Sequence, residues 1–222
     1  MIEAKHITKT IITGKQTIPI LKNISFSLQK GSITAVVGKS GCGKSTLLSI
    51  LAGIDPPVSG EVILNGTNFY RQSPAAQERF RSEQIGILFQ NYHLIPELTC
   101  EENVRMPLAF SRHKERASKV GDMLEQVGLA AKKSLFPRQM SGGEQQRTAI
   151  LRAIVNEPTL LFADEPTGAL DSGTGSQVIH FLINYAHCCN VTVLLVTHDM
   201  DIANQCDRTI FMKDGHIAMP VN

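Results

Sequence analysis

The sequence lacks the features of a membrane-spanning, secreted or nucleic-acid-binding chain. Its longest apolar runs, such as residues 191–196, have the length of a strand and fall short of the ~18 residues that indicate a membrane span. Residues 1–6 carry no signal-peptide pattern. Lys and Arg number 22 against 20 Asp and Glu, and the net charge of +2 gives no electrostatic reason to expect nucleic acid. We therefore expect a cytosolic chain that reaches a membrane only when another protein holds it there.

The cysteines also lack the spacing of a metal site. The chain has five of them, an odd number with irregular spacing and no C-x-x-C pair, which argues against zinc. Reduced thiols in a cytosolic protein are the simplest interpretation. We expect the adjacent Cys188 and Cys189 to fill the end of a helix rather than to do chemistry.

What the sequence does contain is an alternation of strand and helix patterns over 222 residues, of which 42% are hydrophobic. The predicted strands are 21–28, 32–37, 61–64, 85–89, 160–163 and 192–197, the predicted helices are 44–52, 74–84, 141–156 and 176–188, and 208–219 is a predicted hairpin. Residues 99–128 interrupt this alternation with a helical pattern, including a second helix at 114–127. The pattern predicts an α/β core with a helical lobe inserted into it.

A glycine-rich loop follows the predicted strand 32–37. Residues 38–45 read G-K-S-G-C-G-K-S, which matches the phosphate-loop pattern in full, between a strand and a helix as the mechanism requires. The glycines let backbone N–H groups and the positive end of the helix face one anion. Lys44 supplies a charge for the β- and γ-phosphates, and the Ser45 hydroxyl suits a Mg²⁺ ligand. The predicted phosphate-binding residues are Gly38, Lys39, Ser40, Gly41, Cys42, Gly43, Lys44, Ser45 and Thr46.

Two carboxylates stand at the end of the predicted strand 160–163. In open α/β sheets the ligand lies at this end of the strands. Asp164 therefore suits holding Mg²⁺, and Glu165 suits activating the attacking water as a general base. The alternative is that the pair only caps a turn before Pro166; the phosphate loop upstream favours the catalytic interpretation.

A second helix start also looks like an anion site. Residues 140–147 read M-S-G-G-E-Q-Q-R, in which Ser141 and Glu144 form a capping box. Such a helix N-terminus, flanked by small residues, binds anions readily.

These three motifs, in this order, resemble those of an ABC-type ATPase domain over essentially the whole chain. The resemblance implies a P-loop NTPase fold of the ABC ATPase type, in which a mixed sheet core carries an antiparallel β lobe and an inserted helical lobe. We expect one domain over 1–222, with the core and β lobe at about 1–89 and 159–222 and the helical lobe at about 91–157. The implied activity is hydrolysis of ATP with Mg²⁺.

The resemblance also assigns roles to matching residues. Gln90 resembles the glutamine that touches Mg²⁺ and water and links the lobes, and His198 resembles the histidine that contacts the γ-phosphate. In this family two copies enclose two ATP molecules. Ser141 and Gly143 of one copy then bind the γ-phosphate held by the other, and Asp171 belongs to the segment that crosses to the partner.

The chain departs from the family pattern in places. The helix start has Met140 and Glu144 where Leu and Gln are commonest, changes that keep the helix start intact. The family also usually stacks an aromatic residue on adenine, and this chain offers Ile11, so we expect GTP to compete better than usual. Cys42 is either a small filler, which we favour, or a thiol activated by the helix N-terminus and Lys44.

Two longer segments make the resemblance to this family more specific. Residues 89–99, F-Q-N-Y-H-L-I-P-E-L-T, and 163–172, A-D-E-P-T-G-A-L-D-S, are similar to the subfamily of lipoprotein-release, macrolide-export and antimicrobial-peptide-resistance systems. This implies an ATPase subunit that dimerises on ATP, docks on a membrane permease near 90–106, drives export or an extracytoplasmic mechanical relay, and does not touch the substrate.

Two other functions stay open. The alternative within the family is a cell-division-type ATPase that regulates cell-wall remodelling without transport. A soluble ABC ATPase acting on DNA or ribosomes fits less well, because such proteins usually have a coiled coil or tandem domains. The docking residues Tyr92, Leu94, Ile95, Leu98 and Met106 could also be simple core residues of the helical lobe.

Overall fold

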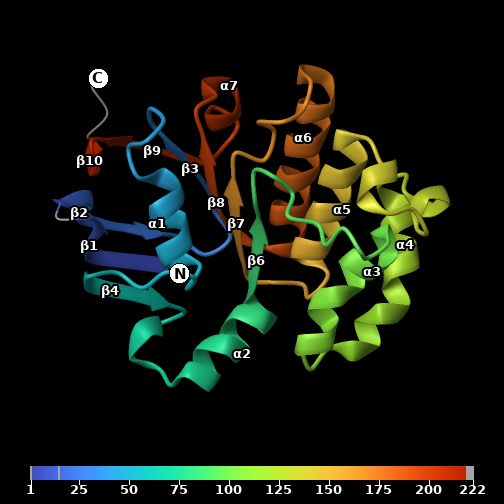
Figure 1. Cartoon of the computed structure of the whole chain (residues 1–222), viewed down its shortest axis with the longest axis horizontal. Coiled ribbons are helices and arrows are strands. Elements are labelled where there is room, and N and C mark those ends of the chain that lie inside the picture. Colours follow the sequence, from blue (N-terminus) through green and yellow to red (C-terminus); the bar gives the residue numbers. More distant parts are fainter. Residues whose placement is uncertain (1, 15, 219–222) are drawn as a thin grey trace.

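The computed structural model describes residues 2–14 and 16–218. The described strands form an antiparallel sheet of order β2-β1-β4-β5 and a mixed sheet of order β10-β9-β3-β8-β7-β6 (Figure 1). The antiparallel sheet consists of β1 (Ile2–Thr13), β2 (Gln16–Leu28), β4 (Ser59–Leu64) and β5 (Thr67–Asn68). The mixed sheet consists of β3 (Ile33–Val37), β6 (Ile85–Leu88), β7 (Leu160–Asp164), β8 (Thr192–Thr197), β9 (Arg208–Lys213) and β10 (His216–Ala218).

The central strands of the mixed sheet are covered on both faces. Every residue of β3 and β8 is buried, as their unbroken apolar runs require. Along β7, Leu160 and Phe162 join the core beneath the antiparallel sheet, whereas Leu161 and Ala163 join the core of the helical side. Strands β6, β7, β8 and β3 run parallel, so their carboxyl ends meet at one edge of the sheet.

Helices pack on the two faces of this sheet. They are α1 (Lys44–Leu51), α2 (Pro74–Gln84), α3 (Cys100–Arg105), α4 (Val120–Gln126), α5 (Gly142–Ile154), α6 (Ser172–Cys189) and α7 (Met200–Ala203), with 3-10 turns among them. Figure 1 shows α1 on the side of the antiparallel sheet, and α5 and α6 on the other side with α3 and α4 beyond them. Within the described residues, no helix has both the length and the apolar character needed to cross a bilayer.

The helical lobe is held together by local caps and one buried amide. Thr99 and Glu102 form a capping box at the start of α3, as Thr99 and the acidic first turn predict. Asn103 is fully buried, and its side chain bonds both the N–H and the carbonyl of Ile95 and also the carbonyl of Leu98. These bonds fasten the segment that precedes α3 onto the helix.

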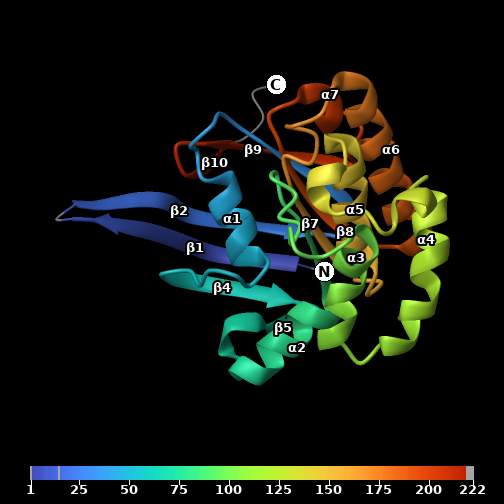
Figure 2. The same ribbon diagram turned by 45° about the vertical axis from the view of Figure 1, so that its right-hand side comes forward.

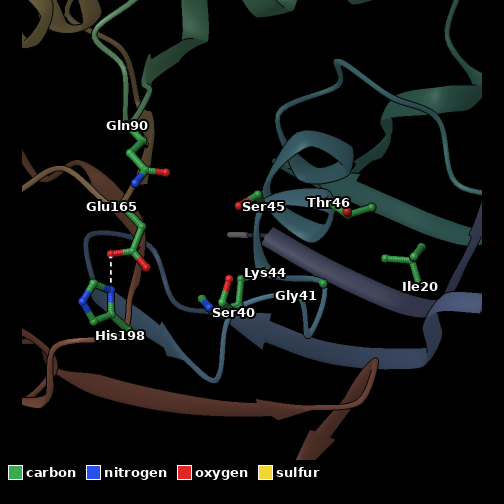
Figure 3. Close-up of a pocket in the computed structure, with 10 residues that line it drawn as sticks. Ile20, Ser40, Gly41, Lys44, Ser45, Thr46, Gln90, Glu165 and His198 are labelled. Carbon is green, nitrogen blue, oxygen red and sulfur yellow. Dashed lines mark hydrogen bonds and ion pairs between the residues drawn. The ribbon is translucent and has the colours of Figure 1, made fainter. Parts of the chain in front are cut away.

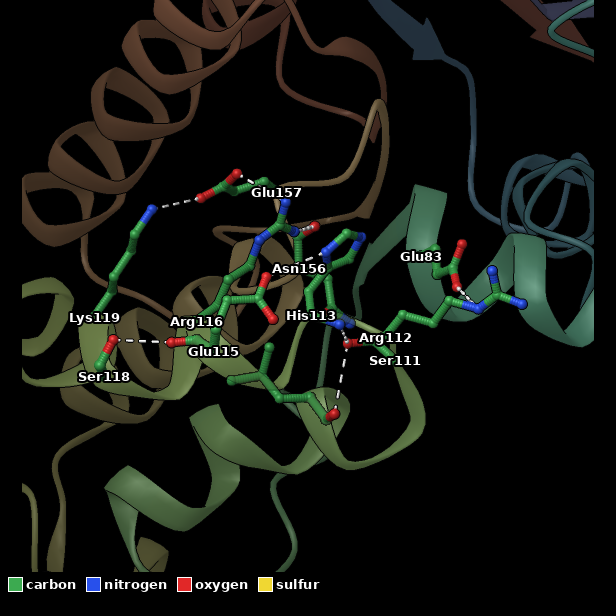
Figure 4. Close-up of polar contacts among 11 residues, drawn as sticks. Glu83, Ser111, Arg112, His113, Glu115, Arg116, Ser118, Lys119, Asn156 and Glu157 are labelled. Carbon is green, nitrogen blue, oxygen red and sulfur yellow. Dashed lines mark hydrogen bonds and ion pairs between the residues drawn. The ribbon is translucent and has the colours of Figure 1, made fainter.

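Ion pairs tie residues 112–116 of the lobe to other elements (Figure 4). Arg112 lies 3.6 Å from Glu83 of α2, and Arg116 lies 3.0 Å from Glu157 just beyond α5. Arg116 also donates to the Asn156 carbonyl, so its positive charge sits at the carboxyl end of α5, where the helix dipole favours it. Ion pairs of this kind, in which one partner stays exposed to solvent, orient segments more than they stabilise them.

Most predicted elements are confirmed, including the strand 192–197 and the helix 74–84 capped by Ser73. The helix predicted at 176–188 begins four residues earlier, because Asp171 caps it by accepting from the Thr174 N–H. The helix predicted at 114–127 is instead a 3-10 segment (Lys114–Lys119) followed by α4. Met219, predicted at the end of the hairpin, lies outside the described residues. The lobe boundaries near 90 and 158 stay predictions.

Candidate functional site

The loop after β3 folds as its glycines predict. Gly41 and Gly43 adopt φ of 79° and 103°, in the left-handed region that glycine enters without strain. A Cβ on Gly43 would lie 2.8 Å from Leu21 Cδ2, so packing against β2 also excludes a side chain there. The loop ends at the N-terminus of α1, where backbone N–H groups lack partners within the helix.

Lys44 lies folded across this loop. Its side chain is buried, and Nζ donates to the carbonyls of Gly38 at 2.7 Å and Lys39 at 3.2 Å. The ammonium group therefore sits at the centre of the loop, where a bound polyphosphate would meet it together with the N–H groups.

A cavity of about 690 Å³ opens beside the loop (Figure 3). Ser40, Lys44 and Ser45 form one side, and Gln90, Glu165 and His198 face them from the other. The complete lining is Ile20, Ser40, Gly41, Gly43, Lys44, Ser45, Thr46, Gln90, Glu165 and His198. The three residues predicted to be catalytic thus come together, because each follows the carboxyl end of a parallel strand.

Glu165 is fixed by its backbone and by His198. It has φ of 46°, uncommon for a residue with a side chain, and its N–H donates to the Val196 carbonyl on β8 at 2.9 Å. His198 Nδ1 lies 2.9 Å from Glu165 Oε2. A carboxylate oxygen only accepts, so Nδ1 carries the proton, and the other carboxylate oxygen is left for another partner.

Asp164 has the features of a cation ligand. Its Oδ1 is buried without a hydrogen-bond partner, and the Ser45 hydroxyl lies near enough to the carboxyl group to oppose the rise of its pKa. Burial raises the pKa of Asp164 and the charge of Glu165 raises it further, against the opposing effects of Ser45 and Lys44. A buried carboxylate oxygen without a partner, beside a hydroxyl, fits the oxygen ligands that Mg²⁺ prefers.

Gln90 reaches the cavity past a glycine. A Cβ on Gly168 would lie 3.3 Å from Gln90 Nε2, so the glycine lets the amide pass close to the backbone after β7. This approach brings the segment after β6 against the segment after β7, and the amide faces the cavity (Figure 3).

Ser141, Gly143 and Asp171 form a second cluster outside this cavity. The capping box is present, with Ser141 Oγ accepting from the Glu144 N–H and Glu144 Oε2 accepting from the Ser141 N–H. A Cβ on Gly143 would lie 2.8 Å from Thr174 Cγ2, which places the start of α5 against the start of α6, where Asp171 is the cap. Neither Ser141 nor Asp171 lines the cavity of the phosphate loop in the same chain.

Three other predicted residues lie away from the cavity. Gly38, Lys39 and Cys42 line a separate hollow of about 810 Å³ between the loop and the β9–β10 hairpin. Cys42 is only 7% exposed and a Cβ on Gly38 would meet its Sγ, a setting that fits the filler interpretation.

The predicted adenine contact, Ile11, stands further along the hairpin than the isoleucine that lines the cavity. Ile20 lines the cavity, and Ile11, 47% exposed on β1 and paired with Ile18, does not. Lys9 pairs with Leu21 and Thr10 with Pro19, so Ile20 is the extra residue of a β-bulge that turns its side chain toward the cavity. The alternation of apolar residues along β2 carries no signal for this bulge.

Comparison with known proteins identifies the family. The sequence model described as ABC transporter matches residues 21–168. The chain is 40% identical to the uncharacterized ABC transporter ATP-binding protein YvrO of Bacillus subtilis (strain 168), over 99% of this chain and 96% of YvrO. It is also 40% identical to the lipoprotein-releasing system ATP-binding protein LolD of Shewanella frigidimarina (strain NCIMB 400), over 97% and 91%.

A third relative is larger than this chain. The macrolide export ATP-binding/permease protein MacB of Neisseria meningitidis serogroup B (strain ATCC BAA-335 / MC58) is 40% identical over 98% of this chain but only 34% of MacB. Among solved structures, the dimeric post-hydrolysis state of the ATP-binding cassette MJ0796 bound to ADP and Pi has a TM-score of 0.91 at 36% identity, covering 99% of this chain and 97% of MJ0796. The chain therefore belongs to the ABC transporter family, in which it is an ATP-binding and ATP-hydrolysing subunit.

Proposed function

We propose that the cavity between the phosphate loop and Glu165 is the site of hydrolysis. The observation that carries this proposal is the placement of Gln90, Glu165 and His198 opposite Lys44 and Ser45 across one cavity. The phosphate loop and Lys44 hold the triphosphate, which leaves its terminal phosphorus facing Glu165. Turnover by the Glu165→Gln variant tests the assignment.

The chemical step follows from these positions. A water molecule attacks the γ-phosphorus, its proton passes to the free carboxylate oxygen of Glu165, and the bond to the β-phosphate oxygen breaks to release ADP. His198 keeps the carboxylate oriented through its Nδ1 bond and presents its other nitrogen to the γ-phosphate, a contact in which that nitrogen must also carry a proton. Gln90 orients the water, and Lys44 balances charge on the phosphate oxygens.

Mg²⁺ fits this arrangement. Ser45, Asp164 and Gln90 are the residues that would hold it, and the unpartnered Oδ1 of Asp164 supports the assignment. When bound, Mg²⁺ supplies positive charge that neutralises the phosphate oxygens.

The active form is a dimer in which each site is completed by the partner copy. Ser141 and Gly143 bind phosphate, yet the described structure puts them outside the chain's own cavity. The solved structure of MJ0796 is dimeric, which supports the same assembly here. Asp171, beside the start of α5, lies where it would cross to the partner copy.

The partner is a membrane permease, which this chain joins as a peripheral subunit on the inner face of the cell membrane. The names of LolD and MacB support lipoprotein release or macrolide export, or a mechanical relay to extracytoplasmic domains, as the work that hydrolysis drives. Regulation of cell-wall remodelling is the second candidate. Identifying the membrane protein that co-purifies with this chain separates the two.

We place the docking groove at one side of the predicted docking region near 90–106. Tyr92 and Leu94 pack against the core of the helical lobe. A hollow of about 440 Å³ lies beside them, and its apolar wall includes Phe89, Met106, Pro107 and Phe110. The side chain of Phe110 is 71% exposed, an unusually high fraction for an aromatic residue. We therefore propose this hollow as the docking site for the permease.

Phe110→Asp should therefore break docking without unfolding the chain. A charge on this exposed position removes the apolar contact and leaves the core untouched. We expect the wild type to sediment with membranes of the source organism and Phe110→Asp to stay in the supernatant, with equal ATPase activity in isolation. Val58→Asp, at a 62% exposed apolar position on the loop before β4, is the matched control that keeps sedimenting. Unchanged sedimentation of Phe110→Asp would refute this groove.

Base selectivity should be weak. Neither Ile20 in the cavity nor Ile11 further along the hairpin offers an aromatic ring for the base. We expect KM values for ATP and GTP within a few fold, and Ile11→Tyr should tighten ATP binding up to about tenfold, the size of a stacking contribution. Ile12→Tyr, on the opposite face of β1, is the matched control without this gain. A strong preference of the wild type for ATP would contradict the expectation.

A further inference from the structure

The turn that follows Gln90 is strained and unusually well held. Tyr92 and His93 both have left-handed backbones, with φ of 59° and 48°, and two such residues in succession are rare outside glycine. The Tyr92 N–H bonds the Phe89 carbonyl at 3.2 Å, and the rings of Phe89 and His93 lie 4.8 Å apart. The turn therefore needs an outside partner to keep its shape.

Arg152 of α5 is that partner. Its guanidinium donates to the Tyr92 carbonyl at 2.6 Å and to the His93 carbonyl at 2.5 Å. The two bonds use the planar fork of arginine, a geometry that lysine cannot reproduce. The half-buried Arg152 side chain thus binds both left-handed residues of the turn.

Tyr92 makes a second contact with the same helix. A Cβ on Gly142 would lie 3.3 Å from the Tyr92 hydroxyl, so this side chain reaches the first residue of α5, ten positions before Arg152. Helix α5, whose cap is Ser141, therefore contacts the turn at two points, one near each end of the helix.

We infer that Arg152 is a positioning residue for hydrolysis: by holding the strained turn at Tyr92 and His93 against α5, it keeps Gln90 at the cavity wall in register with the Ser141 end of the helix. This inference rests on the proposed role of Gln90. Arg152 does not line the cavity itself, so it acts only through the turn.

Steady-state kinetics of four variants test the inference. Arg152→Gln should lower kcat about tenfold and leave KM for ATP within about twofold, because the phosphate loop is untouched. Gln90→Ala should lower kcat by at least as much. The double variant should be no slower than Gln90→Ala alone, since residues that act as one unit are not additive. Arg152→Lys, which keeps the charge without the fork, should recover only part of kcat.

A matched pair at His93 tests the same turn with Arg152 in place, in case Arg152→Gln does not fold. His93→Val disfavours the left-handed backbone and should lower kcat like Arg152→Gln. His93→Gly loses the same ring contact but accepts that backbone, so it should stay near the wild type, and it should partly rescue Arg152→Gln.

The outcomes separate the two proposals. If Gln90→Ala is impaired but the losses of Arg152→Gln and Gln90→Ala multiply, or if the two His93 variants behave alike, the positioning role is overturned while the role of Gln90 stands. If Gln90→Ala turns over normally, the proposed role of Gln90 fails first, and the inference about Arg152 fails with it.

Discussion

Glu165→Gln should lower ATP turnover about 10³-fold, within the range that a positioned general base contributes. The amide cannot take the proton of the attacking water, but its oxygen still accepts from His198 Nδ1, so the geometry around the left-handed residue 165 survives. Phosphate release in a steady-state assay measures the loss.

ATP binding should survive this change, because the phosphate loop at 38–46, which includes Lys44, stays intact. Unhydrolysed ATP should then hold two copies together, and size-exclusion chromatography with ATP and Mg²⁺ should show a dimer that the wild type forms only transiently. Glu97→Gln, at an exposed position in the segment before α3, is the control with wild-type turnover. Normal turnover by Glu165→Gln would remove that residue from the general-base role.

Ser141→Asp should abolish turnover while the isolated chain still binds ATP. Asp caps a helix as well as Ser does, so α5 keeps its start. The new charge, however, would face the γ-phosphate held by the other copy, and like charges ~4 Å apart near a protein surface repel by roughly 4 kcal/mol. Equilibrium binding of a fluorescent ATP analogue and phosphate release measure the two properties separately.

Ser141→Asn is the matched control, since it caps equally well, has the same shape and carries no charge. It should keep a substantial part of wild-type turnover. If Ser141→Asp and Ser141→Asn lose activity equally, the charge is not responsible, and Ser141 acts only as a cap.

The sequence predicts most of the fold because its signals are local and agree with one another. Unbroken apolar runs indicate β3, β7 and β8, and Ser73-Pro74 marks the start of α2. The start of α6 was misplaced because Gly173 and Gly175 weaken a helical pattern that the Asp171 cap nevertheless begins. The local cap, and not helix propensity, decides that boundary.

The residues of the candidate site also divide into those that the sequence predicts and those that it does not. Gln90, Glu165 and His198 could be predicted, because each follows a parallel strand and such strands share one edge. Ile20 could not, since it enters the cavity through a bulge set by pairing with β1. Nor could Arg152, whose partners are backbone carbonyls of residues about 60 positions away that carry no sequence signal.

The central claim is that each hydrolytic site joins the phosphate loop of one copy to the Ser141 end of α5 in another. Lys44→Ala and Ser141→Asp should each be inactive alone, one for loss of phosphate binding and the other for a repelled γ-phosphate. In a mixed dimer both defects fall in one site, and the other site is intact. An equimolar mixture should therefore recover about a quarter of the wild-type rate if the copies pair at random. A mixture that stays at the sum of the two separate variants would contradict the composite site.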